Sequence, residues 1–433
     1  MLRNTIPEII GMIGVHRESE GQSGASLSVF GGVINPGSEI PVGIDKPYIS
    51  EFSKAHETSG FDKVLIGYSA VTPDGFAIAS YAASQTSSLG FLIAHRSGFV
   101  APTLAARQAA TLDHITNGRI ALHIISGGSD ADQKRDGDWI SHDERYLRTE
   151  EYMQVIKKTW ESNSPFDFDG KYYKIQNGFS EIKPYSNASI PLYFGGASEI
   201  AIKIGGLYAD VYALWGEPLD AIRSQIAKIT QINPQRVKPM QFSLSVRPII
   251  GPTEKAAWDK ANHILDKVKQ SLGSKIKPGE SSRPQSTGSR RVLDQALNQD
   301  TYDQRLWMPI ALASGASGST TALVGTPEQV ADALIEYYKL GCSKFIIRGF
   351  DPLGDTIDFG KELIPLIKEK SQTVKTTTIY PPPPETSKLG LVISSGFNNS
   401  VSLSSVSSVF ILATSRIVDP SLAAVLAISA AKS

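Results

Sequence analysis

Cysteine is the scarcest residue type in this 433-residue chain, with one copy at Cys342. One thiol cannot form an intramolecular disulfide, and zinc or iron–sulfur sites built on cysteine pairs are excluded. We therefore expect a cytoplasmic protein in a reducing compartment, with Cys342 as a buried structural thiol rather than a nucleophile. No Gly-x-Ser-x-Gly elbow occurs either, so the main signature of an α/β serine hydrolase is missing.

An excess of charge and a long apolar run are also lacking. The 43 basic residues balance 43 acidic ones, which gives no electrostatic reason to expect nucleic acid or an anionic membrane as a partner. The first residues lack the apolar core of a signal peptide. No eighteen apolar residues follow one another, and the nearest candidate, Ser408–Ala431, is interrupted by Arg416, Asp419 and Pro420. We expect a soluble protein without a membrane span.

Apolar residues make up 41% of the chain, enough for a large core. Short apolar runs alternate with helical patterns, which indicates repeated β/α units and a parallel sheet. Eight strands with helical partners are the number that closes a barrel, so we predict an α/β fold, a (β/α)8 TIM barrel with insertions. An open doubly wound sheet is the alternative, weakened because no Gly-x-Gly-x-x-Gly follows the first strand. The predicted strands are Ile9–Val15, Lys63–Gly67, Leu89–Ala94, Ile120–Ile125, Pro191–Phe194, Val211–Leu214, Phe242–Ile250 and Lys344–Arg348.

Two stretches interrupt the repeat in its first half. Ser126–Asp143 is polar, rich in glycine and too long for a simple loop between a strand and a helix. Phe166–Ile175 carries Asp169-Gly170 between two apolar runs, which predicts a β-hairpin. The long helix between them is predicted over Glu144–Glu161.

Two later regions fall outside the pattern. Ser271–Arg291 is rich in Ser, Gly, Pro, Lys and Arg, which predicts a mobile loop, and we expect a lid over residues 271–300. Four prolines, Pro381–Pro384, lie near the start of a stretch rich in Ser, Val and Ala. We therefore divide the chain into a barrel domain, 1–372, and a tail, 373–433.

The segment Tyr193–Ser198 runs from an apolar strand through two glycines into a helix. Such a turn allows a phosphate to approach the backbone, and free N–H groups at a helix N-terminus bind anions. The alternative is a tight turn with Ser198 as an ordinary N-cap. His142-Asp143-Glu144-Arg145-Tyr146 starts the long helix, where Ser141 or Asp143 caps it. We expect no metal there, and Tyr146 could reach a phosphate if this helix end meets the Gly196 turn.

Charged and titratable residues accompany several predicted strands. His95 and His123 lie where barrel enzymes place their sites, although a buried histidine with satisfied hydrogen bonds is the commoner case. Arg247 lies inside a strand and Arg348 ends one. A charge in such a position is costly to bury alone. Each arginine therefore either pairs internally or binds an anionic ligand.

A set of segments, found in order between Ile9 and Lys370, resembles FMN-dependent alkanesulfonate monooxygenases and related luciferase-like enzymes. The first corresponds to the third helix of that family. The matching segments are Phe99–Asp113 with Asn117–Arg119, His142–Tyr146, Tyr193–Ser198, Trp215–Pro218 and Thr321–Gly325.

The resemblance implies a β/α barrel with insertions that forms a homodimer or homotetramer. It implies an enzyme that binds reduced FMN, delivered by a separate NAD(P)H-dependent flavin reductase, and uses it with O2 to oxygenate a small molecule. The family's phosphate contacts fall on Tyr146, Ala197 and Ser198, with Gly196 in the turn. Its isoalloxazine contacts fall near the residues Thr72, His123 and Ser126.

The substrate positions depart from the alkanesulfonate enzymes. Thr72 stands where those enzymes have a cysteine, and Ser245 and Arg247 stand for an arginine and a histidine. Ser314 and Phe350 replace an arginine and a tyrosine. Arg247 could take over a sulfonate, because guanidinium suits planar oxyanions, with Arg348 as the second candidate catalytic residue.

Several functions stay open on these residues. The leading hypothesis is an FMNH2-dependent two-component monooxygenase of organosulfur compounds that cleaves alkanesulfonate to aldehyde and sulfite. Oxygenation of a sulfone, an alkane or a chelator is the alternative within the same enzyme class. A deazaflavin-dependent dehydrogenase shares the barrel, and a flavin-binding protein without turnover is the alternative from another class.

Overall fold

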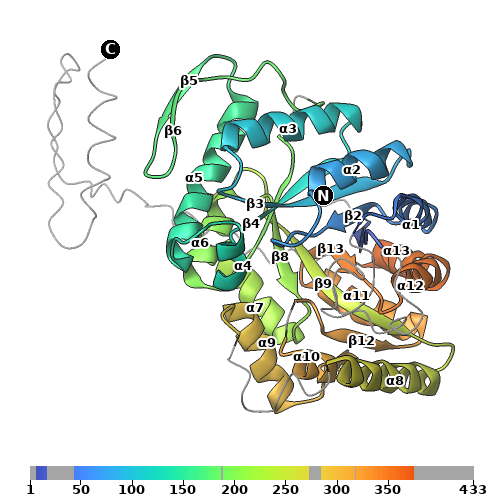
Figure 1. Cartoon of the computed structure of the whole chain (residues 1–433). Helices are drawn as coiled ribbons and strands as arrows, with labels where there is room; N and C mark the ends of the chain where they lie inside the picture. Colours follow the sequence, from blue (N-terminus) through green and yellow to red (C-terminus); the bar gives the residue numbers. More distant parts are fainter. Residues whose placement is uncertain (1–5, 17–42, 187–188, 273–283, 317, 375–433) are drawn as a thin grey trace, which may run out of the picture. The chain divides into compact units, whose positions relative to one another are not determined.

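The computed structural model describes residues 6–16, 43–186, 189–272, 284–316 and 318–374 (Figure 1). The predicted tail, 373–433, lies outside the described residues apart from its first two positions, and so does the centre of the predicted lid. The barrel positions of the prediction are all described.

The core of the fold is a closed barrel of eight parallel strands. Each strand pairs with the next in chain order, and the last pairs with the first, which closes the ring. The predicted TIM barrel is therefore confirmed, and the open sheet is wrong because no barrel strand has a free edge. The barrel strands are β1 (Glu8–Met12), β2 (Lys63–Ile66), β3 (Gly90–Arg96), β4 (Ile120–Ile125), β7 (Leu192–Gly195), β8 (Val211–Trp215), β9 (Gln241–Ile250) and β13 (Cys342–Ile347).

Helices surround the barrel (Figure 1). Their starts follow local chemistry: the side chains of Asp45, Asp74 and Thr326 accept hydrogen bonds from backbone N–H groups of the first turns of α1, α2 and α11. The helices around the barrel are α1 (Lys46–Thr58), α2 (Gly75–Ser84), α3 (Pro102–Ile115), α5 (His142–Glu161), α6 (Glu199–Tyr208), α7 (Leu219–Thr230), α11 (Pro327–Lys339), which comes after the second insertion, and α12 (Pro352–Asp358), continued by the π-helical turn η2 (Phe359–Leu363) and α13 (Ile364–Thr373).

Within the described part of the chain, insertions extend the barrel at two places. Between β4 and β7 lie α4 (Asp130–Arg135) and the predicted hairpin, now β5 (Phe166–Asp169) with β6 (Lys174–Gly178). Between β9 and β13 the chain adds a small sheet: β12 pairs in parallel with the second half of β9, from Arg247 to Ile250. The elements of this second insertion are α8 (Glu254–Leu272), α9 (Thr287–Asn298), β10 (Thr301–Tyr302), β11 (Leu306–Trp307), α10 (Pro309–Ala313) and β12 (Ala322–Gly325).

The predicted loop Ser271–Arg291 is wrong at both of its ends. Helix α8 continues to Leu272, and α9 begins at Thr287. Ser286 caps α9, and Val292 and Ala296, four residues apart, bury one face of the helix. These two signals outweigh the polar composition that suggested a loop.

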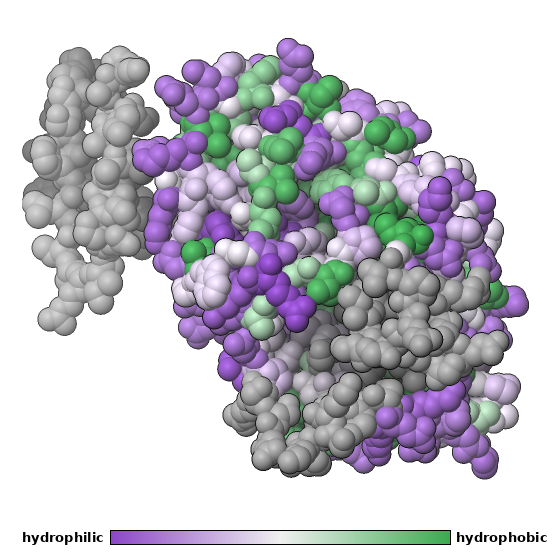
Figure 2. Space-filling view, in the orientation of Figure 1, coloured by the Kyte–Doolittle hydropathy of each residue, from purple (hydrophilic) through white to green (hydrophobic). Residues whose placement is uncertain are grey.

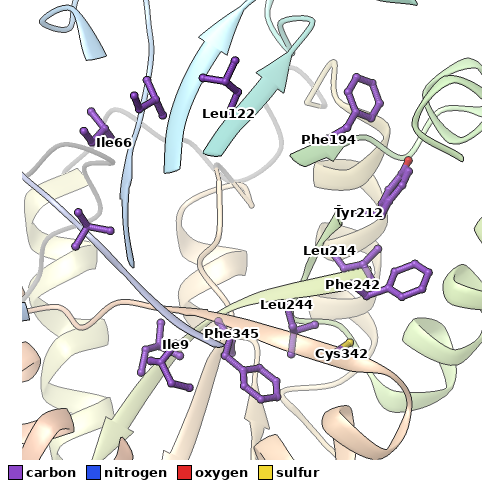
Figure 3. Close-up of a cluster of buried hydrophobic side chains, with 14 of the residues drawn as sticks. Ile9, Ile66, Leu122, Phe194, Tyr212, Leu214, Phe242, Leu244, Cys342 and Phe345 are labelled. Carbon is purple, nitrogen blue, oxygen red and sulfur yellow. The ribbon is translucent and has the colours of Figure 1, made fainter. Parts of the chain in front are cut away.

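Apolar side chains fill both faces of the barrel strands. In β1, Ile9 faces the layer between barrel and helices, whereas Ile10 joins a cluster with Leu92 and Tyr193 inside the barrel. Figure 3 shows part of the outer layer, including Cys342. That thiol is buried, as predicted, and burial raises its pKa to about 12.

Polar and apolar side chains alternate on the face of the molecule in Figure 2, where hydrophobic residues form small groups among hydrophilic ones. Within the part of the chain that the structure describes, no helix is long and apolar enough to cross a bilayer.

Candidate active site

The turn after β7 is the centre of the candidate site. Gly195 ends the strand, Gly196 and Ala197 form the turn, and Ser198 caps α6 by accepting a hydrogen bond from the N–H of Ala201. A methyl group at Gly196 would lie 2.5 Å from the Ala201 side chain. Only glycine therefore permits this close approach, and the first N–H groups of α6 are left at the C-terminal mouth of the barrel.

Tyr146, from the first turn of α5, meets this turn. A methyl group at Gly196 would lie 3.1 Å from the Tyr146 hydroxyl, and the nearby Ser198 side chain acts to lower the pKa of Tyr146, against the larger effect of burial. Burial raises the pKa of Tyr146, so its hydroxyl stays protonated. The condition set from the sequence, that the start of α5 should reach the Gly196 turn, is met. Ser141 caps that helix, also as expected.

The end of β4 carries two further predicted positions. His123 lies in the strand, partly buried, and its Nδ1 has no hydrogen-bond partner among the described residues. Burial lowers the pKa of His123 to about 4, so the imidazole is neutral at neutral pH. Ser126 follows the strand and contacts Thr149 of α5, with 2.9 Å between the hydroxyl oxygens.

Thr72 lies in the loop after β2. Its hydroxyl donates to the Ser69 carbonyl over 2.8 Å and accepts from the Ser69 N–H over 2.9 Å. The side chain therefore closes a local turn, and the structure shows no contact between Thr72 and the residues around Gly196.

Arg247 lies within β9 and Arg348 directly follows the neighbouring strand β13, and the two arginines differ in surroundings. Arg247 is 4% exposed, donates from Nε to the Ser319 carbonyl over 2.9 Å, and stacks on Phe350 at 4.5 Å from the ring centroid. A further donor, Nη1, lies 3.3 Å from the Gly349 carbonyl. Arg348 is partly exposed, and its Nη1 lies 3.4 Å from the sulfur of Met12. Internal pairing, one of the two readings from the sequence, thus describes Arg247.

His95 has a partner outside the mouth. Its Nε2 lies 2.6 Å from the Tyr152 hydroxyl, and the residue is 6% exposed. This is the buried, satisfied histidine that the sequence also allowed.

The sequence analysis did not predict an arginine clamp, centred on Arg96, at the C-terminal rim of the barrel. Arg96, the last residue of β3, forms ion pairs with Asp132 and Asp136 and lies over the Tyr68 ring at 4.4 Å. The Ala70 N–H also donates to Asp132. The clamp joins the loops that follow β2, β3 and β4. Because the predicted third strand ended at Ala94, the rule that singled out Arg247 was not applied to Arg96.

A buried ion pair holds α9 against the barrel, and it was also missed. Glu217, two residues beyond β8, is fully buried and accepts two hydrogen bonds of 2.6 Å from Arg291 of α9. Gln295 donates to the same carboxylate over 3.0 Å. A methyl group at Gly288 in the first turn of α9 would lie 3.6 Å from the Ala197 side chain. Helix α9 therefore borders the glycine turn.

Metal ligands do not gather in this part of the molecule. Among the described residues, no three His, Cys, Asp or Glu side chains lie close enough together to hold an ion. His142 pairs with the adjacent Asp143, with 2.7 Å between Nδ1 and the carboxylate.

The model of the luciferase-like monooxygenase family matches residues 26–344, which is most of the chain. The chain belongs to the luciferase-like monooxygenase family. Membership makes it an enzyme of the flavin-dependent monooxygenase class, as the resemblance of its segments implied.

Solved structures with the same fold support this assignment at the level of architecture. The chain is similar to riboflavin lyase (RcaE), solved with modified FMN and riboflavin, at a TM-score of 0.67 and 18% identity, over 86% of this chain and 93% of that one. EDTA monooxygenase (EmoA) from Chelativorans sp. BNC1 gives 0.64 and 18%, over 86% and 95%. Long-chain alkane monooxygenase (LadA) gives 0.64 and 18%, over 84% and 92%. At such identities the likeness shows the fold alone.

Proposed function

We propose that this luciferase-like monooxygenase is the oxygenating component of a two-component system that binds reduced FMN and oxygenates an organosulfur compound, with alkanesulfonate as the leading substrate. The observation that carries the proposal is the phosphate seat: the Gly196 turn, the N-terminus of α6 and the Tyr146 hydroxyl at one point of the mouth.

The residues present fit FMN. Gly196 lets the turn pack directly against Ala201 and beside the Tyr146 hydroxyl, where a methyl group would lie within 2.5 Å and 3.1 Å of them. A phosphate needs donors, and the hydroxyls of Tyr146 and Ser198 together with the α6 N–H groups supply them. The unpartnered Nδ1 of His123 marks a polar position deeper in the barrel for the ring system. The mouth thus offers one end for a phosphate and another for an aromatic ring.

Protein residues bind and orient, and the cofactor carries the chemistry. When bound, reduced FMN supplies two electrons for the activation of O2 and the transfer of one oxygen atom. For an alkanesulfonate, that oxygen ends in the aldehyde while the carbon–sulfur bond breaks to release sulfite, and the second oxygen leaves as water. Neutral His123 and Ser126 would contact the ring, and helix α9 beside Ala197 would limit the access of water.

Arg348 is the stronger candidate for contact with a sulfonate. It is partly exposed at the C-terminal end of β13, whereas Arg247 is 4% exposed and donates to main-chain carbonyls. Arg247 would then support the pocket indirectly, through its contacts with Ser319 and Phe350. A neutral substrate is the second candidate, because the buried Arg247 is engaged with main-chain carbonyls and a neutral molecule needs no cationic partner. Sulfones, alkanes and chelators are all open under that reading.

The proposed system includes an NAD(P)H-dependent flavin reductase as the source of FMNH2, and a homodimer or homotetramer as the assembly. Both proposals rest on the family. A flavin-binding protein without turnover remains the alternative of another class.

Turnover with a generic flavin reductase, FMN and NADH tests this proposal. We expect sulfite release from at least one member of a panel of alkanesulfonates, with one O2 consumed per sulfite above the background of free reduced flavin. Arg348→Met should raise KM for the sulfonate at unchanged FMNH2 affinity, and Arg348→Lys should recover part of the loss. Oxygen consumption that depends on a sulfone, an alkane or a chelator, without sulfite, would replace the substrate and keep the enzyme class. No substrate-dependent oxygen consumption would favour the flavin-binding alternative.

A further inference from the structure

Three buried hydroxyls form a chain beside the candidate flavin site. Ser97 follows β3, Ser126 follows β4, and Thr149 lies in α5, three residues beyond Tyr146. They are 1%, 5% and 0% exposed. The Thr149 Oγ1 lies 2.6 Å from the Ser97 Oγ, 2.9 Å from the Ser126 Oγ and 2.8 Å from the Arg145 carbonyl oxygen.

Counting protons fixes the direction of these bonds. Each hydroxyl has one proton to donate, and the Arg145 carbonyl has none. If Thr149 donated to either serine, its oxygen would face the carbonyl at 2.8 Å with no proton between them. One arrangement satisfies all three contacts: Thr149 donates to Arg145, and both serines donate to Thr149.

Ser126 is thereby left with lone pairs alone for any further contact. Its proton is committed to Thr149, and the burial of Thr149 leaves no water to take over that role. Ser126 also lies between the two ends of the proposed site, three residues after His123 and bonded to the helix that carries Tyr146. A ligand group that meets Ser126 must therefore bring its own hydrogen.

We propose that Thr149 is a positioning residue that makes Ser126 an obligate acceptor and so favours reduced over oxidised flavin. The inference rests on the proposed function. Reduced isoalloxazine carries a hydrogen on N5, whereas the oxidised ring presents a bare nitrogen with a lone pair there. An acceptor-only hydroxyl gains a hydrogen bond with the first and faces a second lone pair with the second.

Anaerobic titrations of the full chain with reduced and with oxidised FMN test the proposal, through the ratio of the two dissociation constants. Thr149→Val removes the hydroxyl with little change of shape and releases the Ser126 proton. We expect the preference for reduced FMN to fall about tenfold, because Ser126 can then donate a hydrogen bond to the oxidised ring instead of only accepting one from the reduced ring. Thr149→Ser keeps the hydroxyl and should restore the ratio. The midpoint potential of the bound flavin should fall in Thr149→Val by the corresponding amount, because the reduced form is then stabilised less.

Thr159→Val is the matched control. Thr159 lies in the same helix, is also 0% exposed, and donates to the carbonyl four residues earlier over 2.7 Å, with no hydroxyl partner among the described residues. Its ratio should equal that of the wild type. An unchanged ratio in Thr149→Val, or an equal loss of affinity for both forms, overturns the inference.

Wild-type protein that binds neither form of FMN would instead overturn the proposed function, so the two failures are distinguishable. If Thr149→Val does not fold, Ser126→Ala decides the question. That variant should lose about tenfold in affinity for reduced FMN while it binds the oxidised form at least as tightly as the wild type does, and an equal loss for both forms contradicts the proposal.

Discussion

Replacement of Gly196 by alanine tests the phosphate seat most locally. The added methyl would lie 2.5 Å from the Ala201 side chain and 3.1 Å from the Tyr146 hydroxyl. Carbon atoms in contact normally stay about 3.5–4.0 Å apart, so the turn and the first turn of α6 must separate by roughly 1 Å. Overpacking of this kind costs about 1–3 kcal/mol. We expect the strain to displace the phosphate donors and so to weaken binding by a similar free energy. The dissociation constant of reduced FMN should rise by about 5- to 150-fold.

Riboflavin, which lacks the phosphate, separates this effect from a general loss of structure. Fluorescence titrations of Gly196→Ala with reduced FMN and reduced riboflavin should show the loss for FMN alone. Gly43→Ala is the control, since a methyl group there meets no atom within 4 Å. A folded Gly196→Ala protein whose affinity for reduced FMN stays within twofold of the wild type would refute the claim that this turn binds FMN. An equal loss of affinity for riboflavin would refute the claim that the turn binds the phosphate.

Three further predictions concern stability and reactivity. Arg291→Gln leaves the fully buried Glu217 carboxylate without a positive partner and should lower the free energy of unfolding by about 3–5 kcal/mol. Arg290 is exposed, so the control Arg290→Gln should stay within about 0.5 kcal/mol of the wild type in urea denaturation. Burial lowers the pKa of His123, His56 and His95 from 6.5 to about 4. Because the unfolded chain binds protons in this range that the native state does not bind, the free energy of unfolding should fall as the pH drops from 6.5 toward 4. The slope should be smaller in His123→Asn, and an identical slope would contradict this prediction. Cys342, whose pKa burial raises to about 12, should resist iodoacetamide until the protein unfolds, so rapid labelling of native protein would show that the thiol is accessible.

The barrel could be predicted because its strands repeat one local pattern. Each combines a short apolar run with a glycine or polar break and a helix, and both faces of such a strand are buried. Boundaries were less certain: β3 runs on to Arg96, two residues past the apolar run, because ion pairs with Asp132 and Asp136 satisfy its charge. Local composition could not reveal those partners.

The second insertion shows where local patterns fail. Helix α9 begins within a stretch of Ser, Gly and Arg, and packing of Val292 and Ala296 outweighs that composition. Strand β12 is four residues long and is held by β9, more than 70 positions earlier in the chain. Its register depends on a long-range pairing that no local pattern encodes.

The candidate site divides in the same way. The Gly196 turn and the Ser198 cap are local features, readable from a strand, two glycines and a helix start. The approach of Tyr146 could only be stated as a condition, since it depends on how α5 packs. The pair of Glu217 with Arg291, 74 residues apart, had no signal beyond the resemblance of Trp215–Pro218 to the family.

Anaerobic titration of the wild-type protein with photochemically reduced FMN, beside oxidised FMN and together with the double variant Tyr146→Phe/Ser198→Ala, tests the central claim most directly. The account predicts tighter binding of reduced than of oxidised FMN, and weaker binding of the reduced form once both hydroxyls are removed. Equal binding of the two redox forms, or a double variant that binds reduced FMN as tightly as the wild type, would contradict it.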